Sequence, residues 1–148
     1  MNALERYGAF FGNLQPADLE RLDAVFVENA RFQDPFNDVT GLPGIRAVFE
    51  HMYANCAMAR FEVIESIGDE RVGYLRWRFH FRLKRDRQDR RPFEGVSRVV
   101  FADDGRCREH VDYWDAASGL YAQFPVVGGL MRWLRRRLAV PAAAASTS

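Results

Sequence analysis

The sequence predicts one α+β domain, in which three N-terminal helices close a strongly curved antiparallel sheet around an apolar pocket and a further helix lies near the C-terminus. Apolar residues recur at helical spacing through residues 4–52, and their period changes to two between residues 60 and 115. The 148 residues, 48% of them apolar, suffice for one hydrophobic core. We expect a single domain over residues 1–140 and a disordered tail over residues 141–148.

The N-terminal third carries three amphipathic helical patterns. Their apolar positions are Leu4, Tyr7, Phe10, Phe11 and Leu14, then Leu19, Leu22, Val25 and Phe26, and finally Ile45, Val48, Phe49 and Met52. A short extended segment, residues 30–34, stands between the second and third patterns and ends at Pro35. Gly41 and Pro43 mark the start of the third helix.

Strands are predicted from residue 61 onward, over residues 61–67, 72–83, 93–101 and 107–115. Turns or short polar loops separate them, so consecutive hairpins and an antiparallel sheet are expected. Residues 72–83 present an aromatic face and a basic face. We expect the aromatic face to point to the core and the arginines to face solvent or a dimer contact, although alternation alone also allows the reverse.

Charge and cysteine usage exclude several classes of protein. The net charge of +1 is too balanced for nonspecific nucleic-acid binding. Cys56 and Cys107 lack a metal-ligand spacing and are interpreted as ordinary buried thiols. Glu5 and Arg6 interrupt a possible signal sequence, and no window approaches 18 apolar residues, so a soluble, cytoplasmic protein is expected.

The last helical pattern, residues 130–138, interleaves apolar residues with arginines. Basic amphipathic helices can lie on anionic membranes. We expect this helix instead to cap the mouth of the pocket or to pack on a second subunit.

Three short motifs carry a family resemblance: Phe32-Gln33-Asp34-Pro35-Phe36, Arg6-Tyr7 and Tyr113-Trp114. With them, residues 3–120 resemble the nuclear transport factor 2-like superfamily, in particular SnoaL-like proteins and steroid Δ-isomerases. The resemblance implies a cone-shaped, cystatin-like roll and a homodimer formed through the sheet. It further implies that Asp34 is a general base, that the Tyr7 phenol donates a hydrogen bond to a substrate carbonyl, and that Trp114 lines the pocket.

Three positions differ from the isomerase pattern. Ser97 stands where the isomerase has its protonated oxyanion-hole aspartic acid, and Phe26 and Phe49 stand where the family has tyrosines that support the catalytic phenol. These three residues are predicted to line the ligand site. Losing one oxyanion donor typically costs on the order of 100- to 1000-fold in rate, so the resemblance implies a weaker or different activity.

Strand alternation places His110, Asp112 and Trp114 on one face of the last strand. If that face points inward, His110 and Asp112 form either an acid/base pair or a satisfied polar pair. Asp112 before Tyr113 is also similar to limonene epoxide hydrolase, in which a corresponding aspartate activates water. Arg78-Phe79-His80 replaces that enzyme's Arg-x-Asp.

The leading hypothesis is a cofactor-free and metal-free isomerase, or a related proton-transfer enzyme, that acts on an apolar carbonyl compound with Asp34 as base. Asp34 before a proline is also typical of a residue that closes a turn through its side chain, and this interpretation is favoured by the local sequence. Two alternatives remain: a non-catalytic ligand-binding or dimerisation module, and an epoxide hydrolase that uses Asp112 with Arg78 and His80.

Overall fold

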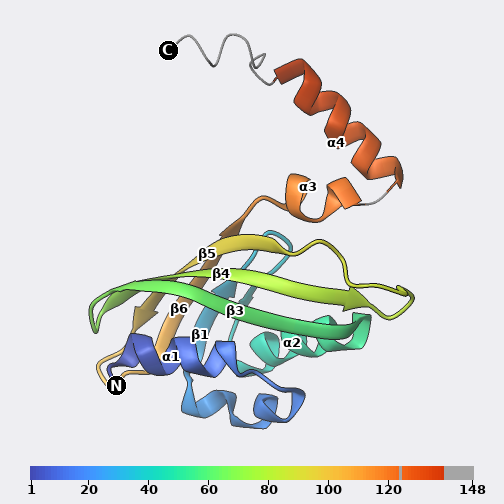
Figure 1. The fold of residues 1–148 in the computed structure, drawn as a ribbon. Coiled ribbons are helices and arrows are strands. Elements are labelled where there is room, and N and C mark those ends of the chain that lie inside the picture. The colour runs from blue at the N-terminus through green and yellow to red at the C-terminus, as the bar shows by residue number, and fades with distance from the viewer. Residues whose placement is uncertain (124, 139–148) are drawn as a thin grey trace, which may run out of the picture. The chain divides into compact units, whose positions relative to one another are not determined.

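The computed structural model describes residues 1–123 and 125–138. They form two compact units, one from Met1 to Trp114 and one that begins at Asp115. The first unit contains the sheet and the N-terminal helical segments, and the described part of the second is helical (Figure 1). The α+β class predicted from the sequence is confirmed.

A curved, six-stranded sheet with the order β2-β1-β6-β5-β4-β3 forms most of the first unit (Figure 1). The helical segments α1, η1 and α2 lie on one side of it. The elements of the first unit are α1 (Ala3–Gly12), η1 (Pro16–Ala24), β1 (Phe26–Gln33), β2 (Asp38–Thr40), α2 (Leu42–Asn55), β3 (Cys56–Gly68), β4 (Val72–Leu83), β5 (Phe93–Phe101) and β6 (Cys107–Trp114).

The strands β3 to β6 form the predicted antiparallel hairpins. β1, however, pairs with β6 in parallel, so the sheet is mixed. This pairing places Phe32 opposite His110. A parallel contact between segments so far apart in the chain leaves no local pattern, which is why alternation and turns did not predict it.

Helix α1 forms where it is predicted. Asn2 and Glu5 make a capping box at its N-terminus, which satisfies two backbone N–H groups. Its buried face includes Leu4, Tyr7 and Phe11. The hydroxyl of Tyr7 is thereby carried into the interior of the unit.

The second predicted helix is instead a 3₁₀ segment, η1, with a non-helical residue at Arg21. Phe26 belongs to strand β1 and not to this helix. Next to it, the Cys107 N–H donates to the carbonyl oxygen of Val25 at 2.7 Å. At Val25 and Phe26, pairing with the distant strand β6 therefore outweighs the helical spacing of the apolar residues. Cys56 begins strand β3 and is only half-buried, so the expected buried thiol is confirmed at Cys107 and wrong at Cys56.

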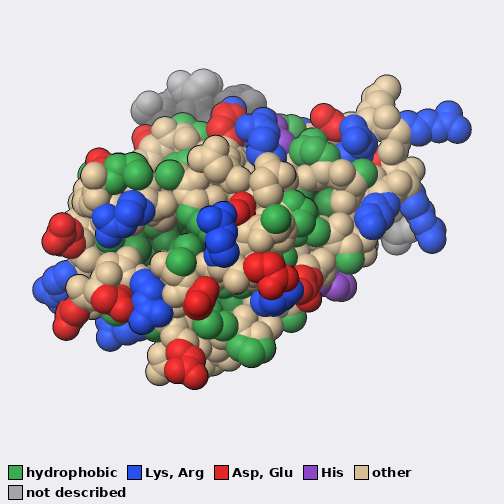
Figure 2. All heavy atoms as spheres, turned by 90° about the horizontal axis from the view of Figure 1, so that it is seen from below, with side chains coloured by type: hydrophobic (Ala, Val, Ile, Leu, Met, Phe, Trp, Pro, Cys, Tyr) green, Lys and Arg blue, Asp and Glu red, His purple; other side chains and the backbone are tan. Residues whose placement is uncertain are grey.

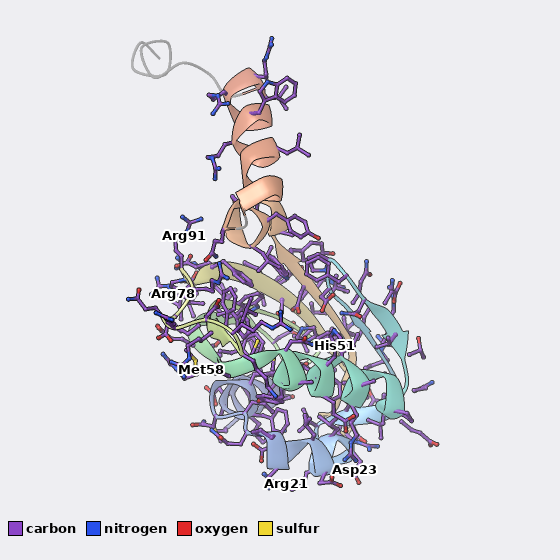
Figure 3. All side chains as sticks on the ribbon, turned by 90° about the vertical axis from the view of Figure 1, so that its right-hand side faces the viewer. Arg21, Asp23, His51, Met58, Arg78 and Arg91 are labelled. Carbon is purple, nitrogen blue, oxygen red and sulfur yellow. The ribbon has the colours of Figure 1, made fainter. Side chains whose placement is uncertain are left out.

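Strand β4 has its aromatic face inward, as expected. Leu75, Trp77, Phe79 and Phe81 are buried. The basic side chains of the other face pair with acidic ones; these pairs are Arg76–Glu94, Arg78–Glu94, His80–Glu62 and Arg82–Asp89. Figure 3 shows Arg78 at the outer side of the sheet. Half-exposed pairs of this kind contribute little stability, so the inward aromatic residues decide the orientation.

Acidic and basic side chains are interspersed over the face of the molecule shown in Figure 2. This agrees with the balanced composition of 21 basic and 20 acidic residues.

The second unit contains α3 (Ala116–Gly119), η2 (Tyr121–Gln123) and α4 (Pro125–Leu138). Asp115 caps α3 by accepting a hydrogen bond from the Ser118 N–H. The predicted C-terminal helix is confirmed in α4, where the guanidinium of Arg137 lies 5.3 Å from the centre of the Trp133 ring. Within the described residues, every helix is too short or too polar to cross a bilayer. The tail predicted over residues 141–148 lies outside the described residues.

The close packing of Gly95 leads to a stability prediction. A Cβ atom at Gly95 would lie 2.5 Å from the Trp77 ring, whereas one at Gly8, inside α1, would meet its nearest neighbour, Leu75, at an ordinary 3.5 Å. We expect Gly95→Ala to lower the free energy of unfolding by about 1–3 kcal/mol through overpacking. Gly8→Ala should leave it unchanged or raise it, because alanine favours the helix. Urea denaturation of both variants checks this, and equal stability would contradict it.

Candidate active site

A small cavity in the first unit, of about 30 Å³, brings apolar and polar side chains together. Its lining is mostly aromatic and aliphatic and includes three polar residues that lie next to one another. The lining residues are Phe11, Phe32, Phe49, Phe61, Val63, Leu75, Trp77, Ser97, His110 and Asp112. A space of this size holds one or two water molecules, whereas pockets for drug-sized ligands measure about 300–1,000 Å³. A larger ligand can therefore enter only if lining side chains move.

Five side chains form a continuous hydrogen-bonded chain at the cavity. The Trp77 indole N–H donates to Ser97 Oγ at 2.8 Å, and the Ser97 hydroxyl donates to Asp112 Oδ1 at 2.5 Å. The same Asp112 oxygen lies 2.5 Å from His110 Nε2. The other ring nitrogen of His110, Nδ1, lies 2.6 Å from the hydroxyl oxygen of Tyr7. The chain thus runs from β4 through β5 and β6 to α1.

The sheet register explains why these groups meet. Alternation along β6 turns His110 and Asp112 to the same side, and the β5–β6 hairpin sets Ser97 directly opposite Asp112. The parallel neighbour β1 supplies Phe32, whose ring stacks on the His110 imidazole with centres 4.5 Å apart. Helix α1 adds Tyr7, which is far from β6 in the sequence.

Burial controls the charge of the groups at the Tyr7 end of the chain. Burial raises the pKa of Tyr7 well above its ordinary value, and nearby Cys107 and Asp112 act in the same direction. Burial also raises the pKa of the Cys107 thiol to about 12. The phenol and the thiol therefore stay neutral over the physiological pH range.

Asp34 lies in the turn between β1 and β2. Its Oδ1 accepts hydrogen bonds from the backbone N–H groups of Phe36, at 2.8 Å, and Asn37, at 2.7 Å. The Asn37 side-chain amide also donates to it. These contacts are those of a turn-closing aspartate, and Asp34 is not among the residues that line the cavity. The geometry supports the turn interpretation over the catalytic one.

The other predicted site residues divide into two groups. Ser97, His110, Asp112 and Phe49 line the cavity. Phe26 is fully buried in the core and packs edge-on against Tyr7. Trp114 lies outside the lining and stacks on Phe93, with ring centres 4.4 Å apart.

The role of Tyr7 also differs from the one the resemblance implies. Its hydroxyl contacts His110, and Tyr7 is not a lining residue. The geometry therefore does not show it aimed at a substrate carbonyl.

The epoxide-hydrolase resemblance is supported at one position and wrong at two others. Asp112 lines the cavity, as that resemblance requires. Arg78 and His80 lie on the opposite face of β4, where Arg78 binds Glu94 at 2.6 Å and His80 lies 3.2 Å from Glu62. They are on that face because their neighbours Trp77 and Phe79 occupy the interior.

Trp77 is the functional residue that sequence reasoning missed. We expected its ring to face inward with the other aromatic residues of the strand, but did not predict that its indole N–H donates to Ser97. Matching the β4 and β5 alternation would have placed both side chains on the same side of the sheet.

Metal binding is not supported by the described part of the chain. Among those residues, no group of three His, Cys, Asp or Glu side chains could hold a metal ion. The cavity itself offers only His110 and Asp112 of these types.

The turn role of Asp34 can be tested by substitution. We expect Asp34→Ala to lower the free energy of unfolding by about 1 kcal/mol, because two backbone N–H groups lose their acceptor. Ligand binding in the cavity should be unchanged. Urea denaturation and a binding titration measure the two effects, with Asp38→Ala, which breaks an exposed pair with Arg31, as the matched control. Loss of binding without loss of stability would restore Asp34 to the site.

Comparison with known proteins adds information at the level of the family and the fold. Among curated proteins, none matches this sequence. A hypothetical protein with a ketosteroid isomerase-like fold from Catenulispora acidiphila, in complex with trimethylamine, has a TM-score of 0.67 at 12% identity, over 82% of this chain and 90% of that one.

Two further solved structures have a similar fold. An LEH-like epoxide hydrolase from M. tuberculosis has a TM-score of 0.66 at 17% identity, over 94% of both chains. A candidate SnoaL-like polyketide cyclase from Shewanella putrefaciens has a TM-score of 0.65 at 15% identity, over 82% of this chain and 92% of that one. At these identities the likeness shows a shared fold.

The family is shown by the sequence itself. The sequence model of the SnoaL-like domain matches residues 7–110, which run from the phenol of α1 to the imidazole of β6. This match covers more than half of the chain and confirms the resemblance stated above. The chain therefore belongs to the SnoaL-like family.

Proposed function

We propose that the protein is a cofactor-free enzyme that moves a proton on a small, largely apolar carbonyl compound, with Asp112 as the base. The observation that carries the proposal is that Asp112 is the one carboxylate among the ten lining residues of a mostly aromatic cavity. Proton abstraction beside a carbonyl needs such a base within reach of the C–H bond. The proposal keeps the chemistry expected from the sequence and moves the base from Asp34 to Asp112.

The two oxygens of Asp112 are used differently. Within the described residues, both hydrogen bonds of the carboxylate involve Oδ1, one donated by Ser97 and one shared with His110. This leaves Oδ2 for the substrate. In the proposed step Oδ2 takes the proton as the C–H bond breaks, the electron pair moves onto the carbonyl system, and the protonated carboxyl then returns the proton to another carbon of the same molecule.

The hydrogen-bonded chain also restricts the substrate. The Trp77 N–H and the Ser97 hydroxyl donate within the chain, and the Tyr7 hydroxyl is held at His110. Among the described residues, these groups therefore offer no free donor to a developing oxyanion. A substrate whose anion is delocalised over its own conjugated system suits the site better than a simple ketone.

Structural neighbours support a small-molecule enzyme. They include a candidate polyketide cyclase and a candidate isomerase of the SnoaL-like family. One fold can host unrelated chemistries, so the argument depends on Asp112 and not on the fold.

Water activation by Asp112 is a second candidate function. The cavity beside Asp112 has room for one or two water molecules, and an epoxide hydrolase shares the fold over nearly the whole chain. In that reaction Asp112 would take a proton from water, the hydroxide would attack an epoxide carbon, and the alkoxide released by C–O cleavage would take the proton back.

Asp112→Asn tests both functions. We expect wild-type protein to convert cyclohex-3-en-1-one to cyclohex-2-en-1-one, which passes through a conjugated dienolate, and the variant to be slower by about 100-fold or more, since a general base contributes that much. NMR in D₂O follows the isomerisation. Glu109→Gln is the matched control, because Glu109 lies on the same strand and pairs with Arg98 outside the cavity.

The outcomes separate the hypotheses. Opening of cyclohexene oxide that depends on Asp112, without isomerisation, would select water activation. Saturable binding of these probes without turnover would select the non-catalytic ligand-binding module. Equal rates for wild type and Asp112→Asn would exclude Asp112 as the base.

A further inference from the structure

The His110 imidazole is held on three sides. Tyr7 contacts Nδ1 at 2.6 Å, Asp112 contacts Nε2 at 2.5 Å, and Phe32 stacks on the ring face. The residue is 4% exposed. Its ring cannot turn toward a ligand without breaking these contacts, so His110 acts through Asp112.

The Tyr7 hydroxyl has two candidate acceptors, His110 Nδ1 and the Cys107 sulfur. A neutral thiol is a weak acceptor, whereas the bare nitrogen of an imidazole is a strong one. Burial keeps the phenol neutral, because it raises the pKa of Tyr7. The Tyr7 hydroxyl therefore keeps its proton, and His110 Nδ1 is a better acceptor for this O–H group than the Cys107 sulfur.

We infer that Tyr7 is a positioning residue that fixes His110 in the tautomer with hydrogen on Nε2, and so aims an N–H donor at Asp112. When Nδ1 accepts from Tyr7, the ring hydrogen of a neutral imidazole is on Nε2, where it meets Asp112 Oδ1. An ionised Asp112 is then satisfied by two donors. The effect of this positioning on turnover rests on the function proposed above. The tautomer of His110 is independent of that function.

The alternative arrangement shows why the choice matters. If Nδ1 carried the hydrogen and donated to the Tyr7 oxygen, the Tyr7 hydroxyl would turn to Cys107 and Nε2 would be bare. A bare nitrogen 2.5 Å from Asp112 Oδ1 requires a proton on the carboxyl group. Asp112 would then be unable to act as a base.

Nitrogen NMR tests the inference without a substrate. In protein labelled with ¹⁵N-histidine, the three imidazoles, His51, His80 and His110, are distinguished by a His110→Gln variant. We expect neutral His110 with hydrogen on Nε2 in the wild type and in Cys107→Ala, which removes the second acceptor of Tyr7. Tyr7→Phe should populate the other tautomer, while Tyr74→Phe, at an exposed tyrosine of β4, should match the wild type.

Three results would overturn the inference: hydrogen on Nδ1 in the wild type, an imidazolium with both nitrogens protonated, or an unchanged tautomer in Tyr7→Phe. If Tyr7→Phe fails to fold, the spectra of the wild type and of Cys107→Ala decide. Hydrogen on Nδ1 of His110 in either protein contradicts the inference, and hydrogen on Nε2 in both supports it.

A kinetic measurement separates this inference from the proposed function. With a probe that turns over, Tyr7→Phe should lower kcat by about 10- to 100-fold with KM little changed, as for the residues that orient metal ligands through a hydrogen bond. If the spectra are as expected and no probe turns over, the positioning of His110 stands and the proposed function fails.

Discussion

The carboxylate of Asp112 is the group on which the organisation of the site depends. Its side chain is only 13% exposed and lies beside a mostly aromatic lining. A charge placed there without partners would cost several kcal/mol or lose its ionisation. Ser97 and His110 supply two short hydrogen bonds, and they in turn are held by Trp77 and Tyr7. Each polar side chain at the cavity is therefore positioned by the need to satisfy this one group.

The aromatic residues around this network set the size of the cavity. Phe11, Phe32, Phe49 and Phe61 all line it, and their rings contact one another or the neighbouring imidazole. Such packing stabilises the unit by burying large rings, and it leaves only about 30 Å³ empty. The packing that stabilises the unit thus limits the size of the ligand that the cavity can hold. Binding a ligand larger than water requires these rings to move.

Tyr7 and Asp34 have hydrogen-bonding partners other than those the resemblance implies. The resemblance to the isomerases implies tyrosines at the positions of Phe26 and Phe49, and neither phenylalanine can hydrogen-bond the Tyr7 phenol. Its hydroxyl instead meets His110 on β6. The resemblance implies a catalytic aspartate at Asp34, but backbone N–H groups of its own turn donate to its carboxylate.

The sequence by itself determined those features that follow from local periodicity. Helical spacing placed Tyr7 and Phe11 on one buried face of α1, and the period of two placed His110 and Asp112 on one side of β6 and gathered the aromatic residues of β4 on one face. Such relations span a few residues, because backbone geometry alone sets them.

Only the tertiary structure decided which side chains meet. Tyr7 and His110 are 103 positions apart, and β1 reaches β6 through a parallel pairing that no turn signals. It also decided that Phe26 begins a strand. These outcomes depend on packing and hydrogen bonding between distant segments, whose energies are summed over the whole unit, so no local pattern in the sequence records them.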